Sequence, residues 1–290
     1  MENNNFTITR LNSYENFKDY MSGMSLEYEK REQYERSLIS DPKSFTAGGS
    51  CYLCRQKVHF LFDYLHAYPI KEILTPNWRE RLVCPMCFLN NRMRAAIHLF
   101  EHFFKPNKSD SAIYIAEQVT PLFQWFARNY ANVTGSEYFG EMIPFGTDRH
   151  GIRNEDLTRL SFADHIFDFV LTFDMFEKIP DFQTAFHECL RVLKPDGCLF
   201  FTVPFDKNSE KNKINAEIKD DETEGSIQPA FHPGPGNPDK SCPVFTTFGW
   251  EILGQLKEAG FFDASAFFYW SDEFGYLGDD QIVFIAQKMS

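Results

Sequence analysis

The sequence predicts an α/β fold in which a doubly wound, mostly parallel sheet follows an N-terminal helical and cysteine-rich module. Two observations carry this prediction. From Ile113 onward, short runs rich in Phe, Ile and Val alternate with helical stretches, which is the pattern of βα units. Before that point, two Cys-x-x-Cys pairs are separated by 29 residues. We therefore expect a helical segment over 1–45, a metal-binding module over 46–108 and a larger domain over 109–290.

The N-terminal segment has the periodicity of an amphipathic helix. Aromatic and Met side chains recur at spacings of three and four, which places them on one helical stripe: Tyr14, Phe17, Met21, Met24 and Tyr28. Ser13 is the expected N-cap, and Asp41-Pro42 is the expected stop. We interpret this helix as one that docks on the body of the protein, with a partner-binding helix as the alternative.

The two cysteine pairs predict a metal site. Cys51 with Cys54, and Cys84 with Cys87, each place two thiolates on a tight turn, and together they supply the four soft ligands of a tetrahedral site. Zinc is the expected metal, and iron–sulfur or free thiols are the alternatives. Four thiolates leave no open coordination position, so the expected role is structural. His59, His66 and His98 are possible competing ligands, whereas Cys189, Cys198 and Cys242 have no partner at motif spacing.

The elements expected after the second cysteine pair begin with a helix over 91–104. The expected strands are 113–116, 132–136, 167–172, 198–203, 264–269 and 282–286. The expected helices between them are 121–130, 182–193 and 248–259. Lys194-Pro195-Asp196-Gly197 is expected to form the turn between a helix and a buried strand. Residues 206–244, rich in Asn, Lys, Asp, Glu, Pro and Gly, are expected to form an inserted lid.

Composition excludes several classes of protein. Hydrophobic residues make up 43% and charged residues 24% of the 290-residue chain, so wholesale disorder is excluded. No apolar run approaches the length of a membrane span, and the N-terminus lacks the pattern of a secretory signal, so we expect a soluble, cytoplasmic protein with no membrane partner. The seven Cys of such a protein are not expected to form disulfides.

Charge is unevenly distributed along the chain. The net charge is −12, which is unfavourable for general nucleic-acid binding. Residues 46–108 nevertheless carry nine Lys or Arg against four Asp or Glu. Five of these cations flank the second cysteine pair, with Trp78 among them: Lys71, Arg79, Arg81, Arg92 and Arg94. They predict either a surface that holds RNA or a phosphorylated substrate, or a solvated basic face.

The stretch 154–205 carries a family resemblance. It contains the strings NEDL, LSFADHIFDFVLTFD and ECLRVLKPDGCLFFTVPF. This ordered set resembles the class I S-adenosylmethionine-dependent methyltransferases, specifically the type 11 group, and the resemblance extends over about 111–290. It implies an enzyme that transfers a methyl group from S-adenosylmethionine, and a Rossmann-like sheet of seven strands. The cofactor would lie over the carboxyl ends of the strands, where open α/β sheets bind ligands.

The resemblance also implies roles for particular residues. Glu137, at the end of the second strand, would accept hydrogen bonds from the ribose hydroxyls. Asp156 would bind the adenine amino group, and Leu157 would cover the ring. Glu117 ends the first strand, and Asp174 would line the cleft near the methionine portion or the substrate.

The chain departs from the family pattern in the loop after the first strand. That loop is Glu117-Gln118-Val119-Thr120-Pro121, without the usual glycines. The Thr120 hydroxyl and the N-terminal amides of the following helix are expected to replace the missing donors for the cofactor carboxylate. A degenerate cofactor loop is the alternative. Two further departures are Glu177-Lys178 after the fourth strand and the order Asp196-Gly197.

Three functions remain open from the sequence. The leading one is methyl transfer to an O or N atom of a small molecule, such as a sugar or a secondary metabolite, with His232 and Asp206 as candidate bases. The second is RNA methylation, in which the zinc module holds the RNA. The third is a non-catalytic binding protein with a degenerate cofactor loop. The acceptor and the oligomeric state are not predicted.

Overall fold

The structure is a computed structural model that describes residues 6–65, 67–70, 73–219, 222–225 and 243–290. Its contacts divide the chain into two compact units. The first unit comprises Met1–Leu11, Glu15–Pro106 and Phe267–Val283, and the second comprises Asn12–Tyr14, Asn107–Ala266 and Phe284–Ser290. This division differs from the boundaries expected from the sequence, because residues 267–283 group with the cysteine-rich part of the chain.

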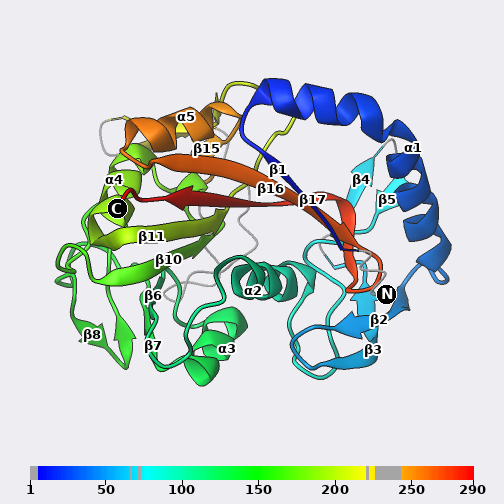
Figure 1. The fold of residues 1–290 in the computed structure, drawn as a ribbon, viewed down its shortest axis with the longest axis horizontal. Coiled ribbons are helices and arrows are strands. Elements are labelled where there is room, and N and C mark those ends of the chain that lie inside the picture. Colours follow the sequence, from blue (N-terminus) through cyan, green and yellow to red (C-terminus); the bar gives the residue numbers. More distant parts are fainter. Residues whose placement is uncertain (1–5, 66, 71–72, 220–221, 226–242) are drawn as a thin grey trace. The chain divides into compact units, whose positions relative to one another are not determined.

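A seven-stranded sheet has the order β1-β16-β17-β11-β10-β6-β7 (Figure 1). Its parallel pairs join β6 (Ala112–Ile115), β7 (Asn132–Gly135), β10 (Phe167–Phe173) and β11 (Leu193–Thr202). The long strand β17 (Tyr276–Gln287) pairs antiparallel with β11. The predicted α/β fold with a seven-stranded sheet is confirmed, and the six predicted strands all exist, most of them displaced by one to a few residues at their ends.

The seventh strand comes from a segment that the sequence analysis described as helical. β1 (Phe6–Leu11) is an edge strand next to β16 (Asp263–Ser271). The sequence FTITRL contains β-branched and aromatic residues, but the segment is only six residues long and lies among polar neighbours. The helix of this segment, α1 (Tyr14–Leu38), begins directly after Ser13, and its predicted stripe is buried or half-buried.

The predicted turn at Lys194–Gly197 lies inside β11 as an irregularity of the strand. Phe167 pairs with Leu193, and the next paired residue, Phe169, is already opposite Cys198. Asp196 has a positive φ of 62° within this bulge. A Cβ on Gly197 would come within 2.8 Å of the Lys194 carbonyl oxygen, so a glycine is required there. The strand therefore begins earlier than predicted, and residues 194–197 form an irregularity within β11 rather than a separate turn before it.

Three helices of the second unit follow the predicted pattern. They are α3 (Pro121–Asn129), α4 (Phe182–Val192) and α5 (Glu251–Glu258). The side chains of Thr120 and Asp181 cap α3 and α4 by accepting hydrogen bonds from the N–H groups of Phe123 and Thr184. α5 begins three residues later than predicted. Before it, Gly249 packs closely against the backbone of Ser209 and Lys211.

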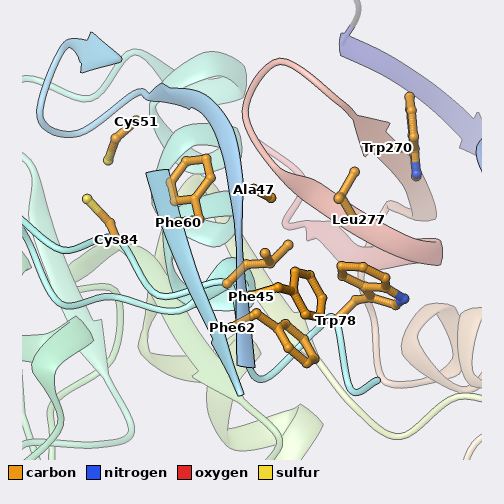
Figure 2. Packing of buried hydrophobic residues seen from close by; sticks show 10 residues of the cluster. Phe45, Ala47, Cys51, Phe60, Phe62, Trp78, Cys84, Trp270 and Leu277 are labelled. Atoms are coloured by element: carbon orange, nitrogen blue, oxygen red, sulfur yellow. The ribbon is translucent and has the colours of Figure 1, made fainter. Parts of the chain in front are cut away.

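The first unit is built around the hairpin of β2 (Ser44–Cys51) and β3 (Gln56–Asp63), which the sequence analysis did not predict. The predicted helix 91–104 is α2 (Asn91–Phe104), with Asn90 as N-cap. A hydrophobic cluster packs around the hairpin (Figure 2); its largest members are Phe45, Phe60, Phe62, Trp78 and Trp270. A short pair, β4 (Tyr68–Ile70) and β5 (Ile73–Thr75), completes the unit.

The second unit also contains several short strands and a 3-10 turn. They are β8 (Asp148–Arg149), β9 (Ile152–Arg153), the 3-10 turn η1 (Phe176–Lys178), β12 (Lys213–Ile214), β13 (Ala216–Lys219), β14 (Glu222–Gly225) and β15 (Thr246–Thr247). The described part of the predicted lid over 206–244 thus contains the strands β12, β13 and β14. Among the described residues, no helix has the length and apolar character needed to cross a membrane.

Candidate functional site

The strand order of the sheet reverses direction between β6 and β10, which makes this pair the topological switch point of the sheet. The chain passes from β6 to β7 on one side of the sheet and later adds β10 on the other side of β6. The loops after β6 and β10 therefore run in opposite directions from neighbouring strands. Open α/β sheets bind ligands at such a point, beyond the carboxyl ends of the strands. The predicted residues Glu117, Glu137 and Asp174 follow β6, β7 and β10, respectively.

Glu137 is held by the loop that follows β6. Its Oε1 atom accepts hydrogen bonds from the N–H groups of Gln118 at 2.8 Å and Val119 at 3.0 Å. Among the described residues, no donor forms a hydrogen bond to Glu137 Oε2. Burial raises the pKa of the Glu137 carboxyl, and the two backbone N–H groups act in the opposite direction by stabilising the charged form. The predicted loop and the predicted acid are thus in direct contact.

The loop without glycines is accommodated by a glycine on the neighbouring strand. A Cβ on Gly135 of β7 would lie 2.8 Å from the Glu117 carbonyl oxygen and 2.3 Å from the Phe123 ring. Gln118 fixes the same loop, because its side chain donates to the Gly151 carbonyl at 2.7 Å and accepts from the Arg153 N–H at 2.9 Å. Sequence reasoning missed both residues; a glycine inside a predicted strand was the available indication of a close backbone approach.

Asp156 and Glu137 are brought together by the backbone. Glu137 forms a parallel bridge with Asn154, two residues before Asp156. The Oδ1 atom of Asp156 accepts from the N–H and the hydroxyl of Thr158, at 2.8 and 2.7 Å, in a local turn. Leu157, which follows, is buried.

Asn154 organises the backbone that leads into this region and was not predicted. Its side chain is fully buried; it accepts from the Phe139 N–H and donates to the Ile143 carbonyl. Because a buried amide with both of these partners fixes its surroundings, Asn154 acts as a support for the residues that follow it.

Asp174 occupies an unusual backbone conformation directly after β10. Its φ is 54°, in the left-handed region, and its side chain is buried. The Thr202 hydroxyl donates to Asp174 Oδ1 at 2.9 Å, and the Asp174 N–H donates to the Thr202 carbonyl at 2.9 Å. Residues held in this region of φ and ψ are typical of functional sites, where the surrounding structure supports the strain.

The remaining predicted residues of the second unit lie in different settings. The Thr120 hydroxyl accepts from the Phe123 N–H at 3.2 Å, so its oxygen caps α3. Asp206 is exposed in a turn, where its Oδ1 atom accepts from the Asn208 N–H at 3.0 Å. No contact described for Asp206 joins it to Glu137, Asp156 or Asp174. His232 lies outside the described residues.

The four predicted cysteines of the first unit form one cluster. All four sulfur atoms lie within 4.8 Å of one another; Cys51 Sγ is 3.9 Å from Cys87 Sγ, and Cys54 Sγ is 3.8 Å from Cys84 Sγ. Four thiolates bound tetrahedrally at a Zn–S distance of about 2.3 Å would be about 3.8 Å apart. Figure 2 shows the sulfur atoms of Cys51 and Cys84 directed toward one another.

The two cysteine turns have the same backbone design. The Arg55 N–H donates to the Cys51 carbonyl and the Phe88 N–H to the Cys84 carbonyl, and both donors have positive φ, 54° and 60°. Each turn therefore closes in the left-handed residue that follows its second cysteine. A hydrogen bond from Cys87 lowers the pKa of Cys51 to about 5, whereas burial and the neighbouring thiolates raise the pKa of Cys54 to about 12.

The four described arginines of the basic face predicted beside the second cysteine pair are buried or paired with carboxylates. Arg92 and Arg94 are buried, and Arg92 Nε lies 2.9 Å from Glu80 Oε1. Arg79 pairs with the same carboxylate, and Arg81 pairs with Asp63. Trp78 is buried, and Lys71 lies outside the described residues. The carboxylates that neutralise these cations were in the sequence, but nothing in their spacing indicated the pairing.

The strand order defines a Rossmann-like fold, with three predicted carboxylates after the carboxyl ends of its parallel strands. Residues 120–201 match the family model of a methyltransferase domain. This match agrees with the methyltransferase resemblance of the sequence over that part of the chain. A search by sequence among curated proteins finds no match.

Several solved structures are similar to this one. The 1,6-didemethyltoxoflavin-N1-methyltransferase of Burkholderia thailandensis, solved with its substrate and S-adenosylhomocysteine, is 14% identical over 68% of this chain and 78% of its own, with a TM-score of 0.43. A Listeria monocytogenes protein assigned as an S-adenosylmethionine-dependent methyltransferase is 11% identical over 67% and 98%, with a TM-score of 0.41. The [4+2]-cyclase SpnF is 14% identical over 68% and 80%, with a TM-score of 0.40. At these values, none of the three bears on what this chain methylates.

Proposed function

We propose that the protein transfers the methyl group of S-adenosylmethionine to an O or N atom of a small molecule. The observation that carries the proposal is the contact between the loop after β6 and Glu137, with Asp156 brought beside Glu137 by the bridge to Asn154. This arrangement gathers two carboxylates and a helix N-terminus at the switch point of the sheet, and their chemistry suits a nucleoside that carries a carboxylate.

The donor set fits the cofactor. In the proposed mode, Glu137 Oε2 accepts from the ribose hydroxyls, because Oε1 is already occupied by the two loop N–H groups. Asp156 accepts from the adenine amino group through Oδ2, since its Oδ1 holds Thr158, and Leu157 covers the ring. The N-terminal amides of α3, with the Thr120 hydroxyl proton, face the cofactor carboxylate. Glu117 and Asp174 complete the methionine side of the site.

In methyl transfer, the main task of the protein is to orient the two reactants. When bound, the cofactor supplies a sulfonium methyl group that an acceptor atom can displace in line. Glu137, Asp156 and the N-terminus of α3 would fix the position of that methyl group. Holding two reactants in line contributes most of the rate acceleration in such reactions. A base is required only when the acceptor must lose a proton. Asp206 and His232 remain the proposed bases.

The basic residues of the first unit favour a small acceptor over RNA. Arg79, Arg81 and Arg92 are paired with carboxylates. Arg94 is fully buried. Phosphate binding requires cations that can exchange their counterions for the nucleic acid, and these four are already engaged inside the unit. These four arginines therefore give no support to RNA methylation, which remains the second candidate function.

We also propose that the cysteine cluster binds one structural Zn²⁺. The sulfur separations match those of a tetrathiolate site, and Cys51 and Cys84 are buried. The tethered turns of the two pairs present all four thiols to one point, so no side chain needs to move far to coordinate the metal. The site has no open position for a substrate and takes no part in methyl transfer.

The test is calorimetry of S-adenosylmethionine and S-adenosylhomocysteine binding to zinc-replete protein, followed by methyl transfer to a panel of small acceptors and to total RNA. We expect micromolar binding, and transfer to small acceptors only. Absence of binding at millimolar cofactor would show that the loop after β6 is degenerate and that the protein is a binding protein. Transfer to RNA that weakens steeply with salt would overturn the choice of acceptor.

A further inference from the structure

Arg94 is a buried cation beside the cysteine cluster. It lies on α2, and its side chain is among the largest that are fully buried. The guanidinium donates to the carbonyl oxygens of Phe274 at 2.7 Å, Leu82 at 3.1 Å and Gly275 at 3.4 Å. Its carbon atom lies 3.8 Å from the centre of the Phe60 ring. These contacts satisfy two of its nitrogens, whereas Nε has no acceptor among the described residues.

No carboxylate of the described residues forms an ion pair with Arg94. The two other buried arginines of this unit behave differently: Arg92 pairs with Glu80, and Arg31 pairs with Asp280 at 3.4 Å. A charge removed from water without a counter-charge is strongly destabilising. Carbonyl oxygens and an aromatic ring bind a guanidinium, but they do not neutralise it. The counter-charge of Arg94 must therefore come from another kind of group.

The cysteine cluster can supply that group, because Arg94 packs against its surroundings. The guanidinium donates to the Leu82 carbonyl, two residues before Cys84, and lies over the Phe60 ring. Leu82 and Phe60 belong to the same buried cluster as Cys51 and Cys84. Four thiolates around Zn²⁺ would carry a net charge of −2, so a loaded site would be an anion in the same part of the unit as a buried cation without a carboxylate partner.

We propose that Arg94 is the charge-compensating residue of the metal centre, and that it couples the loaded centre to the turn between β16 and β17. The coupling follows from its hydrogen bonds. Leu82 precedes the second cysteine pair by two residues, whereas Phe274 and Gly275 lie in the turn between the two strands. The Ser50 N–H adds a second tie, to the Glu273 carbonyl at 2.6 Å.

Gly275 shows how closely this turn fits. Its φ is 63°, and a Cβ at this position would lie 2.7 Å from the Phe60 ring, the same ring that packs against the Arg94 guanidinium. The turn, the ring and the guanidinium are therefore packed without free space. Loss of the metal would leave Arg94 without its counter-charge, and the turn that it holds would loosen. This inference rests on the proposed metal centre and is independent of methyl transfer.

The test compares zinc affinity in the full-length chain by competition with a chromophoric chelator. Arg94→Met keeps much of the side-chain volume and removes the charge, Arg94→Lys keeps the charge, and Arg92→Met removes a buried arginine of the same helix that has its own carboxylate. We expect Arg94→Met to lose about 10–100-fold in zinc affinity, as is typical of groups that support metal ligands. Arg94→Lys should lose less, and Arg92→Met should stay within about threefold of the unmutated chain, because Glu80 rather than the metal centre is its partner.

A second readout is hydrogen exchange over residues 272–278 with and without zinc. Chelation should speed exchange in this turn in the unmutated chain, and in Arg94→Met exchange should be fast even with zinc bound. Equal zinc affinity in Arg94→Met and the unmutated chain, or equal losses in Arg94→Met and Arg92→Met, would overturn the proposal. If Arg94→Met does not fold, Arg94→Gln and Arg94→Lys decide: retention of zinc by Lys alone supports charge compensation, and equal loss in both contradicts it. Less than one zinc per unmutated chain would instead reject the metal centre itself.

Discussion

At the scale of single residues, the site shows a conflict between stability and binding that is clearest at Glu137. Burial raises the pKa of this carboxyl, which means that the native state binds its proton more tightly than the unfolded chain does. Between the ordinary and the raised pKa, the unfolded state therefore holds fewer protons, and stability falls as pH rises. A buried carboxyl group kept at this position despite that cost is consistent with a role in binding.

Glu137→Gln tests this conflict. The amide oxygen can still accept from the Gln118 and Val119 N–H groups, while the buried charge is removed. We expect a melting temperature about 1–3 °C higher at neutral pH. The fall of stability with rising pH that Glu137 contributes should disappear. S-adenosylhomocysteine affinity should fall at least tenfold, measured by calorimetry. A variant that is both more stable and unchanged in affinity would remove Glu137 from the binding site.

Asp156 offers a sharper test of the adenine contact. In Asp156→Asn, the side-chain oxygen can still accept from Thr158, which preserves the local turn. The other atom becomes an N–H₂ donor that faces the adenine amino group, itself a donor. We expect cofactor affinity to fall about 10–100-fold, the range for losing a hydrogen bond to a charged group, with no change in thermal stability. Unchanged affinity would mean that the adenine lies elsewhere.

At the scale of elements, the sequence predicted those parts that depend on local pattern. The strands β6 and β10 were found because short runs rich in Ile, Phe and Val are typical of buried parallel strands, whereas β7 is shorter and partly exposed. The predicted range of α2 agrees with the structure, in which Asn90 caps the helix. β1 was missed because a six-residue edge strand has little pattern of its own. The pairing of the arginines with Asp63 and Glu80 was not predicted, because it arises from tertiary packing, which spacing along the chain does not reveal. The close approach of Gly135 to the Glu117 carbonyl and to Phe123 of α3 depends on tertiary packing in the same way.

Glu35 is one of the buried residues through which α1 packs on the first unit. Glu35 Oε1 accepts from the indole N–H of Trp270 at 3.0 Å and from the Gly278 N–H at 2.8 Å. Glu35→Ala leaves both buried donors without an acceptor, so we expect a loss of about 2–4 kcal/mol in the free energy of unfolding. Glu32→Ala on the same helix removes an exposed pair with Arg36 and should cost less than about 0.5 kcal/mol. Urea unfolding of both variants measures the difference; equal effects would mean that Glu35 does not anchor the helix.

At the scale of the whole molecule, the uneven charge of the sequence acquires a different meaning. The net charge is −12, and residues 46–108 carry an excess of cations. Four of the nine Lys or Arg of this region are engaged inside the first unit: three arginines pair with carboxylates, and Arg94 is buried. Arg55, Lys57, Lys105 and Lys108 are exposed, so part of the positive charge of this region stays at the surface.

Because the metal site draws on both cysteine turns and on the surrounding cluster, its loss should affect the first unit as a whole. Cys84→Ser removes one ligand, and we expect it to lower bound zinc well below one per chain and to lower the unfolding temperature, since the binding free energy of a structural zinc is also folding free energy. Cys189→Ala is the matched control: this cysteine is fully buried in α4 of the second unit and should keep zinc at one per chain, with the modest loss expected of a small cavity. Metal analysis after dialysis and thermal unfolding give both quantities. If Cys84→Ser retains one tightly bound zinc, the four thiolates are not the ligand set. If it loses zinc without losing stability, the metal is bound but does not hold the unit together.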